Sequence, residues 1–186
     1  MIREAGSRDL EILLDWRMET LEHVFAGCPL EGLRSANRRY YQGQLGTGHI
    51  ACFALDRQLL ESAADTFLPQ ADSWQCAIVG CGALCLQQEL PSPDNPSGRC
   101  GYLMNIYVRE PWRHQGYGHE IVQWLMDQAW QHQAGKIWLE SSEAGKPLYR
   151  DLGFADMEDI MVIEPARWEE TEGNGGMEHD GNSENL

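Results

Sequence analysis

The segment that most constrains this chain is residues 101–133, where a strand-like stretch passes through a proline turn and a glycine-bearing loop into a helix. Residues 101–108 are typical of a strand, and Pro111 ends it. The helix is expected from about residue 116 to 133, with Ile121 and Leu125 on its inner face. An amphipathic helix that directly follows a strand has to bury its apolar face, so this segment favours helices packed on a sheet.

The remaining elements are predicted from periodicity and from turn residues. Ser7 is expected to cap the first helix, whose apolar face would consist of Leu10, Leu13, Leu14, Met18, Leu21 and Phe25. Strands are expected at residues 2–5, 49–55, 76–86 and 136–140, helices at 8–25, 31–45 and 145–152, a helical turn or two within 57–75, and one or two last strands after Phe154 that include 160–163. Helices and strands therefore interleave around one sheet, which predicts the α/β (α+β) class.

Size and composition point to one folded domain. The chain has 186 residues, which suits a single core. Residues 1–165 are predicted to form this domain, and residues 166–186 an acidic, disordered tail, because that stretch is polar and glycine-rich with little to bury. The six cysteines stand mostly among strand-like residues without the spacing of a zinc site, so buried reduced thiols and no metal are expected.

Charge and hydropathy limit the partners. The formal net charge is −15, and residues 156–186 hold ten acids against one base. An acidic body repels nucleic acid and favours a cationic acceptor. No apolar run is long enough to cross a bilayer, and the first residues lack the apolar stretch of a signal peptide. A cytoplasmic protein without nucleic-acid or membrane partners is therefore expected.

The loop before the helix at residues 116–133 has the chemistry of a phosphate site. The first backbone N–H groups of a helix are unpaired and carry partial positive charge, so they bind anions. Gly116 and Gly118 let that backbone come close to a ligand, and Arg113 adds a positive charge. The stretch lacks both the P-loop pattern and the three-glycine spacing of a dinucleotide fold.

A second motif follows about thirty residues later, and the two together resemble the GNAT superfamily of N-acetyltransferases. Residues 113–118, RHQGYG, are similar to its acyl-CoA motif, Arg/Gln-x-x-Gly-x-Gly/Ala. Residues 149–154, YRDLGF, are similar to its later Tyr-x-x-x-Gly-Phe element. The resemblance covers residues 2–163 by element order and 101–154 by motif. It implies a single mixed, mostly antiparallel central sheet flanked by helices, with splayed middle strands.

The resemblance also implies the site. Acetyl-CoA would be the co-substrate, its pantetheine arm lying along the strand that ends at Val108 and its pyrophosphate on the amides of the glycine loop. A backbone N–H near Asn105 would polarise the thioester carbonyl. Ser142 stands where many relatives have asparagine. The predicted cofactor-binding residues are Ile106, Tyr107, Val108, Arg113, His114, Gln115, Gly116, Tyr117, Gly118, His119 and Ser142.

Tyr149 is the predicted general acid, because the thiolate leaving group has a pKa of about 8.5 and needs a proton as it departs. The base that deprotonates the amine stays open: Glu89 is a weak candidate, Glu19, Glu22, Glu140 and Glu143 are others, and ordered water is an alternative.

The function implied is transfer of acetyl to a primary amine of a small molecule or peptide. The alternative is a non-catalytic acyl-CoA-binding module. The acceptor, the acyl length and the oligomeric state stay undecided, a homodimer being one option.

Overall fold

The computed structural model describes residues 1–64, 73–158 and 160–162. Residues 1–154 form one compact unit. Its centre is a five-stranded sheet in the order β1-β2-β3-β4-β5. The strands are β1 (Ile2–Ala5), β2 (His49–Leu55), β3 (Ile78–Gln88), β4 (Arg99–Val108) and β5 (Lys136–Leu139). The first four pair antiparallel, and β5 pairs parallel with β4. This confirms the mixed, mostly antiparallel sheet.

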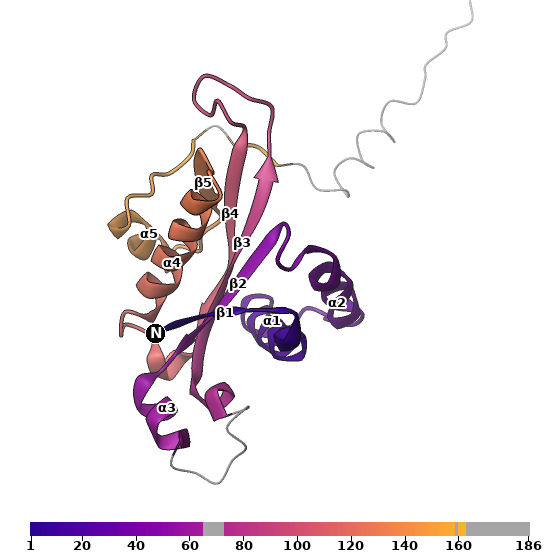
Figure 1. Ribbon diagram of the computed structural model, residues 1–186, viewed down its shortest axis with the longest axis vertical. Helices are drawn as coiled ribbons and strands as arrows, with labels where there is room; N and C mark the ends of the chain where they lie inside the picture. The colour runs from indigo at the N-terminus through magenta and orange to yellow at the C-terminus, as the bar shows by residue number, and fades with distance from the viewer. Residues whose placement is uncertain (65–72, 159, 163–186) are drawn as a thin grey trace, which may run out of the picture. The chain divides into compact units, whose positions relative to one another are not determined.

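Helices cover both faces of the sheet (Figure 1). The helices are α1 (Leu10–Val24), α2 (Leu33–Gln44), α3 (Arg57–Ala64), α4 (Tyr117–Gln131) and α5 (Lys146–Asp151). In Figure 1, α1 and α2 lie on one face and α4 and α5 on the other. Within the described residues, none of the helices has both the length and the hydropathy that crossing a bilayer requires.

Strand β2 shows how the two faces are filled. Ala51, Phe53 and Leu55 belong to the core under α1 and α2, whereas Ile50, Cys52 and Ala54 belong to the core under α4. Successive side chains of a strand point to opposite faces, so a continuously apolar strand supplies two cores at once. All seven β2 residues are accordingly buried.

Close packing of α4 on β3 depends on Gly82. A Cβ on Gly82 would lie 2.3 Å from Cγ2 of the fully buried Ile121. Real Cβ atoms do not approach that closely, so any larger residue would push α4 away from the sheet. The small residues of β3 thus place the start of α4 near β4.

Two local expectations are wrong. Ser7 does not cap α1: a 3₁₀ turn (Ser7–Asp9) precedes the helix, and the Asp9 carboxylate instead accepts hydrogen bonds from the Gly6 N–H at 2.9 Å and from Arg3. Phe25 lies just beyond the end of α1 and is about half exposed. Trp16 is instead one of the buried residues of α1, and the predicted apolar face did not include it.

The end of the domain also differs from expectation. The described residues after Phe154, 155–158 and 160–162, form neither strand nor helix. The predicted last strand at 160–163 is therefore absent from its described part, because apolar β-branched composition alone does not supply a pairing partner. The predicted tail at 166–186 lies outside the described residues, as do residues 65–72 of the 57–75 segment.

All six cysteines are free, as the composition predicted. Cys52, Cys81 and Cys100 are buried, but Cys28 and Cys76 are exposed, against the expectation of burial. These two stand in the connections before α2 and β3 rather than inside a strand.

His49 is a buried titratable group, only 2% exposed. Its Nδ1 lies 3.2 Å from the Tyr40 hydroxyl, and its Nε2 has no hydrogen-bond partner among the described residues. Burial, with a smaller contribution from Arg17, lowers the pKa of His49 from 6.5 to about 4. The folded protein therefore holds this imidazole neutral.

Acidification is expected to destabilise the folded protein through His49. In the unfolded chain the His49 imidazole has a pKa of 6.5, whereas in the folded chain its pKa is about 4. The stabilisation is thus complete above pH 6.5 and is lost as the pH falls toward 4, by at most about 3 kcal/mol. Urea unfolding at pH 7.5, 6 and 5 measures it. His49→Gln should flatten this dependence, while the control His132→Gln, at an exposed site, should keep it; an unchanged slope in His49→Gln would contradict the assignment.

Candidate active site

The site is built around an irregularity in β4. Cys81 pairs with Tyr107 and Ala83 with Met104, so the single residue Gly82 faces both Asn105 and Ile106. This is a β-bulge, and Asn105 adopts the left-handed conformation with φ of 56°. A bulge takes backbone amides out of the regular ladder and makes them available to a ligand.

The other edge of β4 is open at the same level. The parallel pairing with β5 runs only from Cys100 to Leu103, although β4 continues to Val108. The last five residues of β4 therefore have no partner strand on the β5 side among the described residues. This is the splayed pair of middle strands that the resemblance implied.

A cleft of about 790 Å³ lies along this open stretch. The predicted site residues that line it are Asn105, Ile106, Tyr107, Val108, Arg113, His114, Gly116, Gly118, His119, Ser142 and Tyr149. They come from β4, the following loop, the start of α4 and the segment from β5 to α5. The fold thus brings most of the predicted site together from distant parts of the chain.

The start of α4 borders the cleft. Gly116 caps the helix with φ of 91°, and His114 has φ of 60°. A left-handed residue at these positions turns the first amides of α4 outward, where they have no intrahelical acceptor. Gly118 packs closely on Leu148, because a Cβ there would lie 3.2 Å from Leu148 Cδ2. His114, Gln115 and Gly116 are exposed, so the backbone of the loop is accessible.

Arg113 is held beside these amides. Its Nε donates to the Val108 carbonyl at 3.0 Å, and its Nη2 donates to Nε2 of His23 at 3.0 Å. The guanidinium is thus fixed by β4 on one side and α1 on the other. His119 lies 3.8 Å from the Asp151 carboxylate, at the exposed rim. A fixed cation beside free helix amides suits a phosphate group.

Tyr149 lies in α5 and is half buried. Its ring packs on Phe154, with centroids 5.9 Å apart and planes at 77°. Burial raises the pKa of Tyr149 above 10, so the hydroxyl remains protonated at neutral pH. Among the described residues, no protein group forms a hydrogen bond with this hydroxyl, which leaves it available to a ligand in the cleft.

Gln115 and Tyr117 belong to the loop but do not line the cleft. The Gln115 amide donates to the Pro111 carbonyl at 2.8 Å. The Tyr117 hydroxyl donates to the Asp56 carboxylate at 2.5 Å, and this contact raises the pKa of Tyr117 to about 12. Their side chains therefore hold the loop to Pro111 and to Asp56 rather than facing the cleft.

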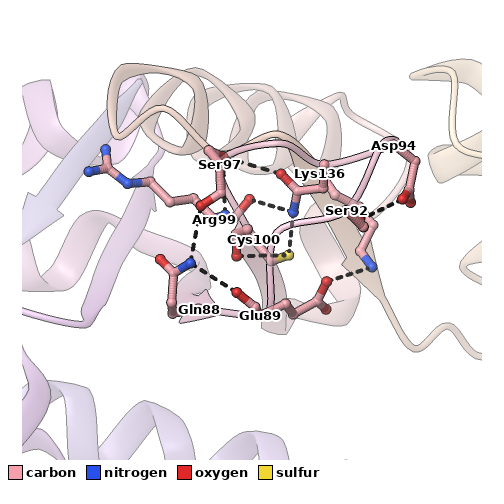
Figure 2. Close-up of polar contacts among 10 residues, drawn as sticks. Gln88, Glu89, Ser92, Asp94, Ser97, Arg99, Cys100 and Lys136 are labelled. Carbon is pink, nitrogen blue, oxygen red and sulfur yellow. Dashed lines mark hydrogen bonds and ion pairs between the residues drawn. The ribbon is translucent and has the colours of Figure 1, made fainter.

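Glu89 does not join the site. It follows β3 at the end remote from the bulge, where its carboxylate accepts a bond from the Lys136 amine at 3.1 Å (Figure 2). That ammonium holds the pKa of Glu89 below its ordinary value. Glu19 is also engaged: Arg109 donates to its two oxygens at 2.8 and 2.7 Å and lowers its pKa. Of the five acids considered as base, only Glu140 lines the cleft.

Sequence reasoning considered only Glu19 and Glu22 on the first helix and missed the residues of α1 that line the cleft. Arg17, Thr20 and His23 all line the cleft. A signal for Arg17 was present, because this cation stands four residues after Leu13 and four before Leu21, on the buried face of the helix. Four further residues that were not assigned to the site also line the cleft: Trp112, Ser141, Ala144 and Asp151.

Among the described residues, no three His, Cys, Asp or Glu side chains form a group that could hold a metal ion.

Comparison with known proteins gives a family and a fold. The model of the acetyltransferase (GNAT) family matches residues 30–154. No match was found among curated proteins. A predicted acetyltransferase from Clostridium acetobutylicum, solved with acetyl-CoA, is similar with a TM-score of 0.74 and 21% identity over 90% of this chain and 97% of that one.

Two further structures are similar at lower identity. A GCN5-related N-acetyltransferase from Ralstonia eutropha has a TM-score of 0.67 and 18% identity, covering 88% of this chain and 97% of that chain. Glucosamine-6-phosphate N-acetyltransferase from Arabidopsis thaliana has a TM-score of 0.62 and 15% identity, covering 88% and 98%. At these identities the structures establish the shared fold.

Proposed function

Because this chain belongs to the acetyltransferase (GNAT) family and is therefore an acyltransferase, we propose that it transfers the acetyl group of acetyl-CoA to a primary amine of a small molecule or a peptide. The observation that carries this proposal is that one cleft combines the start of α4, the β4 bulge and Tyr149. An anion site, backbone donors and a protonated acid in one cleft are what acyl transfer from a coenzyme thioester requires.

The coenzyme is assigned to the α4 side of the cleft. The amides at the start of α4, with Arg113, would hold the pyrophosphate, since both are positive and directed at the cleft. The open edge of β4 from Ile106 to Val108 would pair with the amide groups of the pantetheine arm, and Ser142 would border the arm. Acetyl-CoA is thus a co-substrate held largely by backbone groups.

The reaction is a direct attack. The amine nitrogen bonds to the carbonyl carbon, and negative charge grows on the carbonyl oxygen, where a backbone N–H at Asn105 or Ile106 would stabilise it. The carbon–sulfur bond then breaks, and the Tyr149 hydroxyl gives its proton to the departing sulfur. The nitrogen of the new amide releases its surplus proton through water, and this proton restores the tyrosine hydroxyl. The products are the N-acetyl amine and coenzyme A.

The acceptor must lose a proton before it attacks, because an alkylammonium has a pKa of about 10. We assign Glu140 as the acid that takes it, directly or through water, because Glu140 lines the cleft. Its carboxylate accepts a bond from the Tyr102 hydroxyl at 3.3 Å. Glu89 has no part in this scheme because Lys136 engages it outside the cleft.

Calorimetric titration with acetyl-CoA, coenzyme A and ATP, followed by a thiol-release assay over a panel of primary amines, tests the proposal. Binding of the two coenzymes but not of ATP, with amine-dependent thiol release, is expected. Coenzyme binding without release for any amine would point instead to a non-catalytic acyl-CoA-binding module. Absence of coenzyme binding to the folded protein would remove both functions.

A further inference from the structure

Arg17 is a cation of the cleft to which the coenzyme assignment gives no role. It projects from α1 into the cleft and is half buried. Its Nη1 donates to Oδ1 of Asn105 at 2.8 Å, and its Nε donates to Oδ1 of Asn37 at 3.3 Å. Two neutral amide oxygens therefore hold the guanidinium in place, one from the β4 bulge and one from α2.

No carboxylate neutralises Arg17 among the described residues. Other arginines of this part of the fold are paired: Arg109 with Glu19, Arg34 with Asp15 and Arg3 with Asp9. The chain has 29 acids against 14 Lys and Arg residues, so potential partners are abundant. A partly desolvated cation without a counterion costs free energy, and a ligand anion would offset that cost.

The guanidinium still has donors to offer. The bonds to Asn37 and Asn105 use Nε and Nη1, and Nη2 has no acceptor among the described residues. An arginine presents its N–H groups in a planar fork that suits a carboxylate or a phosphate. The geometry of Arg17 therefore favours an anion in the cleft.

The position of Arg17 relates this anion to the reaction. Arg17 contacts the side chain of Asn105, whose backbone belongs to the bulge that would hold the acetyl carbonyl. The coenzyme phosphates would lie at the other end, near Arg113. Glu140, which would meet the acceptor amine, and Arg17 both act on Tyr102. Burial and then Glu140 raise the pKa of Tyr102, and Arg17 lowers it. The acceptor end thus carries one anion and one cation.

We propose that the acceptor is an amine that also bears an anionic group, a carboxylate or a phosphate, and that Arg17 binds this group. This inference rests on the proposed acetyl transfer and names its substrate class. It differs from the cationic acceptor that the net charge favoured, because net charge describes the whole surface, whereas specificity depends on the few groups that contact the ligand.

The test uses the complex with coenzyme A, which cannot turn over. Calorimetry compares paired probes: proteinogenic amino acids against their carboxamides, and O-phosphoethanolamine and glucosamine 6-phosphate against ethanolamine and glucosamine. The wild type is expected to bind anionic members of one series at least about tenfold more tightly than the neutral members, the effect of one charged hydrogen-bonded contact. The series that binds identifies carboxylate or phosphate.

Three variants separate the role of Arg17 from a general effect of charge. Arg17→Gln should remove the preference for the anionic member, and Arg17→Lys should retain part of it. Arg34→Gln removes the same charge from α2 outside the cleft and should keep the full preference. Equal binding of both members by the wild type, binding of neither, or an unchanged preference in Arg17→Gln would overturn the inference.

Thiol release with acetyl-CoA, measured for the same pairs, keeps the two proposals apart. Turnover of neutral amines as efficiently as anionic ones would overturn the substrate class and leave acetyl transfer intact. Selective anion binding without any thiol release would support the role of Arg17 in binding and count against the proposed enzyme activity.

Discussion

Replacing Gly116 by glutamate is expected to weaken acetyl-CoA binding at least about 100-fold. Gly116 caps α4 with φ of 91°, a conformation that costs about 1–2 kcal/mol for a residue with a Cβ. The new carboxylate would also stand at the helix start, where it would compete with the pyrophosphate for the free amides and repel it. Calorimetric titration with acetyl-CoA measures the change directly.

Gly46→Glu is the matched control. Gly46 has φ of 79°, has open space where a Cβ would stand, and lies between α2 and β2 outside the cleft. It therefore carries the same backbone strain and the same added charge without touching the coenzyme. Wild-type affinity is expected in Gly46→Glu once its fold is verified by circular dichroism. Wild-type affinity in Gly116→Glu would show that the start of α4 does not hold the phosphates.

Removing the Tyr149 hydroxyl is expected to lower kcat by about 100-fold or more, the usual contribution of a general acid. Phenylalanine keeps the ring that packs on Phe154, so the fold and the cleft should be preserved. Because the hydroxyl would act on the departing sulfur, the loss should fall on kcat, while the Kd for acetyl-CoA changes little. Thiol release under saturating acetyl-CoA, together with calorimetry, separates the two quantities.

Tyr40→Phe removes a tyrosine hydroxyl from α2 outside the cleft and is the control for this experiment. It is expected to keep wild-type turnover. If Tyr149→Phe also kept it, water rather than Tyr149 would protonate the thiolate, and the tyrosine would only shape the cleft.

Much of the fold follows from local sequence signals. The strand that ends at Val108, the glycine loop and α4 were predicted close to their observed bounds, because apolar periodicity and left-handed glycines act within a few residues of one another. Pairing is harder to predict. Residues 160–162 have an apolar pattern but no strand, since a strand forms only where another strand accepts its hydrogen bonds.

The base candidates show the same limit at the level of single residues. Glu89 and Glu140 each adjoin a strand end, and the sequence does not distinguish them. The structure distinguishes them. Lys136 donates a hydrogen bond to Glu89 at the end of β3 remote from the bulge, and of the two acids only Glu140 lines the cleft. Which strand end faces the ligand depends on sheet order and register, and these are set by contacts between distant residues.

By itself, the sequence determined the start of α4 at Gly116, where we propose that phosphate binds, and the placement of Tyr149 before a glycine-closed helix end. Both are properties of neighbouring residues, because helix amides and glycine conformations are local. Only the tertiary structure decided that Arg17 of α1 lies against Asn105 of the β4 bulge, 88 positions along the chain, with no carboxylate beside it among the described residues. The packing of α1 on the sheet creates that contact, and no sequence interval encodes it.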